Sequence, residues 1–583
     1  MPTLEWIGKE KVVNHHLEVP YRVLERKYSF DENGQTEADN GSENMIIHGD
    51  NLEALKSLLP QYEGRVKCIY IDPPYNTGNE GWVYNDNVND PHIKAWLNKT
   101  VGKEGEDLSR HDKWLCMMYP RLKLLQKLLS EDGAIFISID DTEYANLKLI
   151  CDEIFGSNCF VSNISWQRTY STRNDSKGIV NEVEHIVVYS KQPDWNPNKL
   201  PRTAEMDAKY KNPDNDRTLW RTDNAFAPGA ATHQGMVYAI QHPFTGKMLY
   251  PANGRCWTFG QDQMLEIMRG WCSYELRDLN DSHERAVVCG VPESDVRQGV
   301  QAIVLSEPLE VSKQKAQAVY DRGQWPRFFF TKGGKGGIAR KTYLENVGGK
   351  LPTNFWPFSE TGHTDEAKKE MLAIFDGKAT FDTPKPHRLI EFVLKVAGSK
   401  DSLILDSFAG SGTTAHAVLN MNKADGGNRK FILVEMGDYA DSITAERVKR
   451  VIHGYGEGKN AVEGTGGNFS FYELGEPLMV GDVLNENVGI DKIREYVYFT
   501  DTKTPLPESC PEEPYLMGVH VNSAYYFYYE KQSVTTLNRQ FLHTVKTKAD
   551  AYVIYADLCT LGEAELEKYH ITLKKIPRDI TKL

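Results

Sequence analysis

The chain has 583 residues, too many for one ordinary hydrophobic core, so several domains are expected. Hydrophobic residues make up 40% of it and charged residues 26%, a globular composition that excludes a largely disordered protein. The net charge of −13 gives no general attraction to nucleic acid, so a nucleic-acid partner would need a local basic surface, for which TKGGKGGIARK at 331–341 is the candidate.

Strand and helix patterns alternate along the first part of the chain. After a polar stretch that predicts a loop at 31–44, the spacing of apolar residues indicates strands and helices in turn, at 45–47, 51–59, 68–71, 114–129 and 134–139. Such alternation is typical of a parallel, doubly wound α/β sheet. From about 161 to 381 the periodicity weakens and Gly, Pro, Trp and Arg become frequent, which predicts an inserted domain.

The alternation returns after the insert, so the sheet domain is split in the sequence. Further helices and strands are predicted at 386–397, 402–405, 412–421, 431–434 and 438–452. Strand and helix signals continue from about 484 and predict a small C-terminal α/β domain. We therefore expect an N-terminal extension, a first sheet part, an insert, a second sheet part and a C-terminal domain, at 1–40, 41–165, 166–381, 382–478 and 479–583.

The segment Asp72-Pro73-Pro74-Tyr75 follows a predicted buried strand, at the strand end where doubly wound sheets bind ligands. The prolines fix the backbone without donating hydrogen bonds, so the Asp72 carboxylate and the Pro73 carbonyl offer two neighbouring acceptors. Two acceptors suit an exocyclic amino group, whose N–H bonds must be held before its nitrogen attacks a methyl donor. Tyr75 would stack on an extruded base. The alternative is a proline turn with an aromatic ring packed over it.

A glycine-rich turn, DSFAGSGTT at 406–414, again lies between a predicted strand and a helix. Its glycines permit a tight turn and a close approach of the backbone to a ligand. The turn lacks the ending of a phosphate-binding P-loop and the Gly-x-Gly-x-x-Gly of a dinucleotide site. One strand later, Glu435 either accepts hydrogen bonds from ribose hydroxyls, which the preceding glycine turn favours, or is an exposed acid at a strand end. Asp50 and Asn51, after the first strand, either hold an adenine amino group or cap a helix.

The sequence predicts no membrane span, disulfide framework or metal site. No apolar run approaches the ~20 residues that a span needs, and MPTLEWIGKE at the N-terminus lacks a signal pattern, so a cytoplasmic protein is expected. The nine cysteines never occur as Cys-x-x-Cys and are interpreted as buried thiols. His111, His185, His387 and His416 show no metal-ligand spacing, so each is expected to be structural.

Together, DPPYNTG at 72–78 and FAGSGTTA at 408–415 resemble the beta class of amino-methylating DNA methyltransferases. In that class the catalytic motif precedes the target-recognition domain and the cofactor motif follows it, which is the order found here. TPKPHRLIE at 383–391 is similar to the family's second cofactor motif. The resemblance covers about 1–475. Within the class, three further segments resemble modification (Mod) subunits of Type III restriction-modification systems. They are LEWIGKEKVVNHHLEVPYRVL at 4–24, HGDNLEAL at 48–55 and VYND at 83–86.

The resemblance implies a Rossmann-like, circularly permuted sheet that uses S-adenosylmethionine to methylate the 6-amino group of an adenine flipped out of double-stranded DNA. It implies that Asp72, Pro73, Pro74 and Tyr75 form the catalytic site. The cofactor-binding residues that it implies are Asp50, Asn51, Lys385, Asp406, Phe408, Ala409, Gly410, Ser411, Gly412, Thr413 and Glu435. It also implies a homodimer and a restriction (helicase-nuclease) subunit as partners, with no membrane association.

The insert would then be the target-recognition domain, with a Gly- and Lys-rich loop at 332–350 that either clamps the DNA backbone or is merely solvated. Candidates for groove or stacking contacts are Trp166, Arg168, Arg173, Trp220, Arg221 and Arg255. Asp at position 72 favours adenine over cytosine N4, and the lack of a Pro-Cys motif disfavours carbon methylation. The alternatives are a solitary adenine methyltransferase, a cytosine N4 amino methyltransferase, an RNA or protein amide methyltransferase, and a recognition scaffold for a nuclease-helicase partner.

Overall fold

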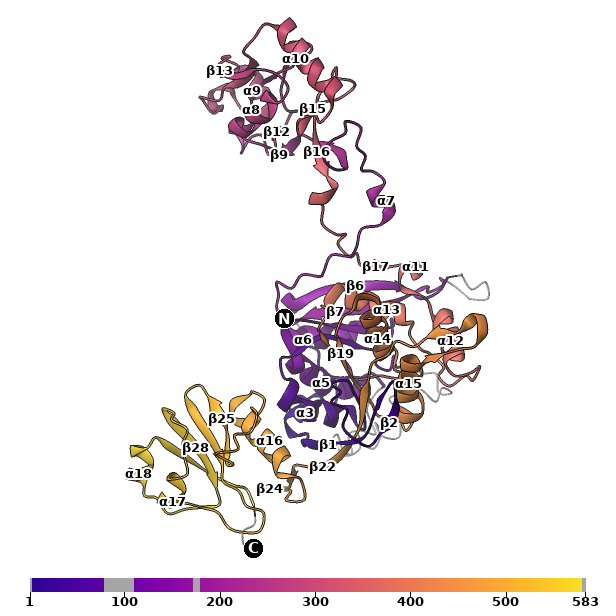
Figure 1. The fold of residues 1–583 in the computed structure, drawn as a ribbon, viewed down its shortest axis with the longest axis vertical. Coiled ribbons are helices and arrows are strands. Elements are labelled where there is room, and N and C mark those ends of the chain that lie inside the picture. Colours follow the sequence, from indigo (N-terminus) through magenta and orange to yellow (C-terminus); the bar gives the residue numbers. More distant parts are fainter. Residues whose placement is uncertain (1–2, 78–109, 171–178, 579–583) are drawn as a thin grey trace. The chain divides into compact units, whose positions relative to one another are not determined.

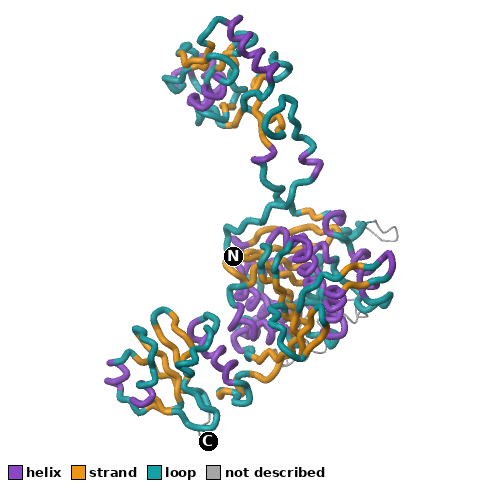
Figure 2. Tube along the Cα trace, in the orientation of Figure 1, coloured by secondary structure: helices purple, strands orange, loops and turns teal. Residues whose placement is uncertain are grey.

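The computed structural model describes residues 3–77, 110–170 and 179–578 (Figure 1). The chain divides into two compact units, one of Met1–Asn198 with Leu351–Leu583 and the other of Lys199–Lys350. Figure 2 shows that helices surround the strands at the centre of the larger unit. Among the described residues, no helix has the length and apolar character needed to cross a bilayer.

An 11-stranded sheet organises the larger unit. Its middle is parallel and runs in the order β5 (Leu129–Ile139), β4 (Val66–Ile71), β18 (Leu403–Asp406), β19 (Lys430–Glu435), β3 (Met45–His48) and β22 (Phe469–Pro477). Beyond β5 lie antiparallel β7 (Val183–Ser190), then β6 (Phe160–Gln167) and β17 (Phe355–Trp356). Beyond β22 lie antiparallel β1 (Arg22–Asp31) and β2 (Gly34–Thr36).

The strand order brings the two sequence motifs together. β4, which precedes Asp72, pairs in parallel with β18, which ends at Asp406, in a register that sets Leu405 opposite Ile69. Because both strands run the same way, their carboxyl ends share one edge of the sheet. Residues far apart in the sequence therefore meet there, as the split sheet domain predicted.

Helices pack in two groups on the sheet. One group is α3 (Asn51–Tyr62), α5 (Arg110–Leu128) and α6 (Tyr144–Phe155); the other is α13 (His387–Ala397), α14 (Thr413–Asp425) and α15 (Glu446–His453). Successive side chains of a strand point to opposite faces. Ile69 and Ile71 of β4 accordingly pack in the core with the first group, whereas Tyr70 between them lines a cavity near the second motif.

The predicted helices and strands of both sheet parts are confirmed, apart from small shifts at their ends. One prediction near the N-terminus is wrong. The stretch at 31–44, expected to be a loop, begins with a β1–β2 hairpin, and β1 joins the sheet by pairing with β22. Tyr28 and Phe30 of β1 are buried, so the alternate residues of this strand supply the apolar face that a sheet position requires.

The smaller unit, Lys199–Lys350, has its own core and sheets. Strands β10 (Ile240–Gln241), β14 (Ala302–Leu305) and β13 (Tyr274–Arg277) pair beside β11 (Met248–Leu249), and β16 (Ile338–Tyr343) lies between β15 (Phe328–Phe330) and β8 (Trp220–Asn224). The unit is shorter than the insert expected at 166–381. β7 and β17 from that range instead belong to the central sheet, because Val187 and Tyr189 of β7 pack in its core.

The chain beyond 479 forms a separate four-stranded sheet with flanking helices, in keeping with the strand and helix signals there. Its strands are β25 (Leu516–His520), β26 (Ser523–Phe527), β28 (Ala551–Ala556) and β30 (Ile571–Lys575). α18 (Glu563–Lys568) connects the last two. Tyr526, Ile554 and Ile571 pack in a core of their own.

Candidate active site

The Asp72–Tyr75 segment is a braced turn at the carboxyl end of β4. Nε1 of Trp114 in α5 donates a hydrogen bond to the carbonyl oxygen of Pro74 at 2.7 Å. Asn76, which adopts a left-handed φ of 59°, donates from Nδ2 to the carbonyl of Arg110 at 3.1 Å. Since the prolines donate nothing, these contacts from α5 hold the turn. They fix the backbone on which the Asp72 carboxylate is carried.

A cavity of about 270 Å³ lies over the carboxyl ends of β4 and β18. Its volume is near the lower limit of small-molecule sites, roughly 300 Å³. Both motifs contribute to its wall, through Asp72, Pro73, Tyr75, Asp406, Phe408, Ala409, Gly410, Ser411 and Thr413. The predicted catalytic and cofactor motifs therefore border one space.

Asp72 is paired with Lys385, a residue expected in the cofactor site. The Lys385 ammonium nitrogen lies 2.8 and 2.7 Å from the two Asp72 carboxylate oxygens, and it donates to the hydroxyl of Tyr75 at 2.9 Å. Tyr75 in turn donates to Asp72 Oδ1 at 2.8 Å. Burial raises the pKa of Asp72 above its ordinary value, and the Lys385 charge limits that rise. Lys385 thus acts directly on the predicted catalytic carboxylate.

Glu184, at the start of β7, is a second carboxylate beside this pair. Its Oε2 lies 3.6 Å from the Lys385 ammonium and accepts a hydrogen bond from Tyr75 at 3.2 Å, while Arg168 donates to Oε1 at 2.7 Å. Burial alone would raise the pKa of Glu184, but the charges of Lys385 and Arg168 outweigh it and hold the pKa below its usual value. The side chain is 7% exposed, so this carboxylate is a buried ion facing the cavity.

The glycine turn is held by two carboxylates. Asp406 accepts hydrogen bonds from the Phe408 amide at 3.0 Å and from the Thr414 hydroxyl. Glu435 accepts from the amide of Gly410 at 2.7 Å through one oxygen, and from that of Gly437 at 2.9 Å through the other. Glu435 was expected to bind ribose and is not among the residues that line the cavity; its carboxylate instead contacts Gly410 of the turn and Gly437, two residues after it.

The turn also requires glycine at two positions. Gly410 and Gly412 have left-handed φ angles of 51° and 78°. A Cβ on Gly410 would lie 3.1 Å from the ring of Phe381, and one on Gly412 would lie 3.0 Å from the carbonyl oxygen of Thr444. Both strain and crowding therefore exclude a side chain. Burial raises the pKa of Asp406, at the start of the turn, to about 7.

Asp50 adopts the helix-capping alternative, whereas Asn51 is the first residue of α3 and contacts the glycine turn. Asp50 is the N-cap of α3, and its Oδ1 accepts hydrogen bonds from the amides of Leu52 and Glu53 at 2.8 and 3.2 Å. Asn51 is buried and donates to the carbonyl of Ser407 at 3.1 Å. Neither residue lines the cavity. Their contact with a cofactor stays a prediction.

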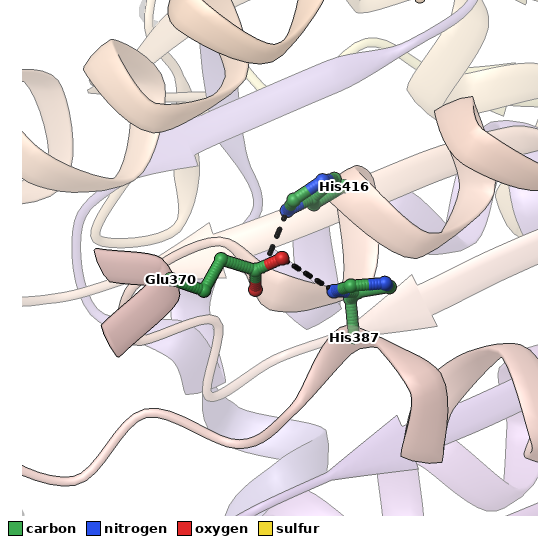
Figure 3. A group of neighbouring side chains, drawn as sticks. All are labelled: Glu370, His387 and His416. Atoms are coloured by element: carbon green, nitrogen blue, oxygen red, sulfur yellow. Dashed lines mark ion pairs between the residues drawn. The ribbon is translucent and has the colours of Figure 1, made fainter. Parts of the chain in front are cut away.

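Behind the glycine turn, four helices bring charged side chains into one cluster, which we call the Glu370 cluster: Glu370, His387, His416 and Arg447. Figure 3 shows the carboxylate of Glu370 facing both histidines. His387 Nδ1 lies 2.6 Å and His416 Nδ1 3.9 Å from its oxygens. Arg447 lies 3.1 Å from both Glu370 Oε2 and His416 Nδ1. These contacts are made by Nη2 of Arg447, and its Nη1 donates to the hydroxyls of Ser411 and Thr413.

The Glu370 cluster brings two of the histidines together, and their structural role stays a prediction. His387 and His416, expected to be separate structural residues, stack with ring centroids 4.8 Å apart and form with Glu370 a group whose ligand atoms are close enough to surround a metal ion. The guanidinium of Arg447 already supplies positive charge at that point. Burial opposes ionisation of Glu370, but the hydrogen bond from His387 and the charges of His416 and Arg447 lower its pKa to about 2.

Several residues differ from the expectations for DNA contacts. Trp220 is buried in the core of the smaller unit, and Lys341 of the basic segment is buried in ion pairs with Asp214 and Asp216. Trp166 and Arg168 line the cavity. Arg221 and Arg255 are exposed. Arg173 and the VYND sequence at 83–86 lie outside the described residues.

Sequence reasoning missed Glu184, Asp140 and Phe381 of the cavity wall. Glu184 and Phe381 fell within the range assigned to the insert, where no motif singled them out. The only available signal for Glu184 was an acid beginning an apolar run, VEHIVVYS, that reads as a buried strand.

Comparison with known proteins adds the following relationships. The family model described as DNA methylase matches residues 66–498. The StyLTI Mod subunit, of a Type III restriction-modification enzyme from Salmonella typhimurium, is 34% identical over 440 residues, which cover 70% of this chain but only 57% of that subunit. Type II methyltransferase M.KpnI of Klebsiella pneumoniae is 30% identical over 411 residues, covering 70% of this chain and 84% of that enzyme. A solved PvuII DNA methyltransferase (cytosine-N4-specific) aligns at 13% identity over 70% of this chain and 86% of its own, with a TM-score of 0.31.

Proposed function

The chain belongs to the DNA methylase family, and from that premise we propose that it is an adenine-specific DNA methyltransferase. It transfers a methyl group from S-adenosylmethionine to the exocyclic 6-amino group of an adenine flipped out of double-stranded DNA. One observation carries this proposal: Asp72 and the glycine turn of β18 border a single cavity. An acceptor for an amino group and a backbone turn for a cofactor are thus side by side, as direct methyl transfer requires.

The residues around the cavity fit S-adenosylmethionine in charge and shape. Asp72, Asp140, Glu184 and Asp406 outnumber the basic groups of Lys385 and Arg168 in the wall, which suits a ligand with a sulfonium and an ammonium group. Glycine at 410 and 412 leaves the turn without side chains. When bound, S-adenosylmethionine supplies an activated methyl group. The predicted contacts of Phe408, Gly410, Ser411 and Thr413 with it are part of this proposal.

Asp72 and Pro73 perform the chemistry that the chain itself contributes. Their carboxylate and carbonyl oxygens accept the two N–H bonds of the amino group, so its lone pair points toward the methyl carbon. As the new C–N bond forms, the bond between the methyl carbon and the sulfonium sulfur breaks and its electron pair stays on sulfur. The nitrogen becomes positively charged, and the Asp72 carboxylate stabilises that charge and receives the extra proton. Tyr75, whose hydroxyl is fixed on Asp72, presents its ring to the extruded base.

The similarity to Mod subunits supports a place in a Type III-like restriction-modification system. In that case the chain is the modification subunit, forms a homodimer and associates with a restriction (helicase-nuclease) subunit. Because the chain spans only 57% of the StyLTI Mod subunit, these partners rest on similarity alone. The compact unit at 199–350 is the proposed core of the target-recognition domain, within the insert expected at 166–381. The cytoplasmic location stays a prediction.

The proposal is tested by incubating the purified chain with duplex DNA and S-adenosylmethionine carrying a labelled methyl group. Digestion of the DNA to nucleosides should recover the label as N6-methyladenine. Asp72→Ala should abolish transfer while cofactor binding, measured by titration calorimetry, persists. Label in N4-methylcytosine would instead identify cytosine as the target base. If the label enters RNA or protein substrates but not DNA, DNA is overturned as the substrate.

A further inference from the structure

The ammonium group of Lys385 occupies the acceptor atoms that the proposed chemistry needs. It lies within hydrogen-bond distance of both Asp72 oxygens and of the Tyr75 hydroxyl, with a side chain that is only 11% exposed. The ammonium donates N–H bonds to Asp72, as the amino group of the substrate would. Its position resembles that of the substrate's amino group in the proposed complex.

This arrangement conflicts with methyl transfer if it persists. Transfer places a positive charge on the substrate nitrogen beside Asp72, and a second cation on the same carboxylate would repel that charge at short range. The cationic intermediate would then lose the stabilisation that Asp72 provides. Lys385 must therefore leave Asp72, or form a weaker ion pair with it, when the base is present.

A second partner for Lys385 is already in place. Glu184 Oε2 lies 3.6 Å from the Lys385 nitrogen and is buried, so a small rotation of the lysine side chain brings the two into contact. Arg168 holds the other Glu184 oxygen at 2.7 Å, which keeps the acceptor fixed while the lysine moves. A buried ammonium cannot be left without a counter-ion, and Glu184 supplies one at the same depth.

Resting on the function proposed above, we propose that Lys385 occupies the target-amino position on Asp72 before the base enters, and that Glu184 is the positioning residue that receives Lys385 as the base takes its place. The exchange replaces the buried ion pair of Lys385 with Asp72 by one with Glu184. Asp72 stays ionised in both states, first against the lysine and then against the amino group. Glu184 thereby lowers the cost of inserting the base without touching the base itself.

The first test removes the second partner with Glu184→Gln, which keeps the shape of the side chain. Among the described residues, Lys385 then keeps Asp72 as its one ion-pair partner. Insertion of the target adenine, followed by the fluorescence of 2-aminopurine placed next to it in the duplex, should fall about 10-fold to 100-fold, the effect of one neighbouring opposite charge. The affinity for S-adenosylmethionine should not change. Glu131→Gln, at an exposed carboxylate on β5, is the matched control and should behave as the unaltered chain.

The second test replaces the lysine by methionine. Without Lys385, burial raises the pKa of Asp72 further, so the rate of methyl transfer should fall at neutral pH and recover as the pH rises. The acid limb of the pH–rate profile should shift upward by about one unit or more. Insertion of the target adenine above that limb should become easier, because the ammonium that competes with its 6-amino group for Asp72 is gone.

The outcomes separate this inference from the proposed function. If the unaltered chain transfers no methyl group to adenine, the proposed function fails. If it does, but Glu184→Gln inserts the base normally, the exchange is overturned. It is also overturned if Lys385→Met weakens S-adenosylmethionine binding and leaves the pH profile unchanged, since Lys385 would then serve the cofactor alone.

Discussion

Replacing Glu435 by Gln should loosen the backbone that this carboxylate holds before any ligand is considered. Each Glu435 oxygen accepts one backbone amide, from Gly410 at 2.7 Å and from Gly437 at 2.9 Å, and the residue is 5% exposed. Glutamine offers one oxygen and one NH2 group, so one of these amides faces a donor and loses its acceptor. A buried unsatisfied amide costs about 1–3 kcal/mol, and about 2 kcal/mol is a reasonable central value.

Hydrogen exchange followed by mass spectrometry measures this loss directly. About 2 kcal/mol corresponds to roughly a 30-fold fall in protection, since 1.36 kcal/mol is a factor of ten. The fall is expected in the segment whose amide faces the new NH2 group, either 408–412 with Gly410 or 436–438 with Gly437. Glu473→Gln, at a partly exposed carboxylate on β22, is the control and should leave both segments protected. If Glu435→Gln weakens cofactor binding while protection of both amides is unchanged, Glu435 acts on the ligand and our account of its structural role is refuted.

Three further predictions concern the same region. Because burial raises the pKa of Asp406 to about 7, S-adenosylmethionine should bind more tightly as the pH rises from 6 to 8, by at most about tenfold per unit, and calorimetry should find no such trend in Asp406→Asn. Gly412→Ala adds left-handed strain of roughly 1–2 kcal/mol and a Cβ 3.0 Å from the Thr444 oxygen, so its melting temperature should fall below that of Gly426→Ala, where φ is 66° but the space is open. Glu370, with a pKa lowered from 4.5 to about 2, contributes about 3 kcal/mol of stability above pH 4.5; Glu370→Gln should lose that amount at pH 7, and denaturant titrations should find the difference shrinking as the pH falls toward 2.

The fold was predictable where its signals are local. The apolar strand before Asp72 and the one before the glycine turn are short, continuous runs, and each ends in residues that break regular structure. Parallel strands place such ends on one edge, which is why a cavity shared by the two motifs could be anticipated. β1 was missed because its polar neighbours resemble a loop, and only pairing with β22, far along the chain, makes it a strand.

The side-chain contacts were less predictable because they depend on tertiary distance. Lys385 was recognised by its motif, but its ion pair with Asp72, 313 residues away, has no local signature. Glu184 carries no motif at all, and it becomes part of the cavity wall only because β7 runs back beside β5. The roles of Asp50 and Asn51 were ambiguous in the sequence, since an acid or amide before a helix serves a cap and a ligand equally well.

The most direct test of the central claim is long-read sequencing for N6-methyladenine in the DNA of a methylation-free host that expresses this chain. Our account predicts methylated adenine within one recurring sequence, present with the unaltered chain and absent with Asp72→Ala. The same mark in both cells, or no methylated adenine despite a folded chain that binds S-adenosylmethionine, would contradict it.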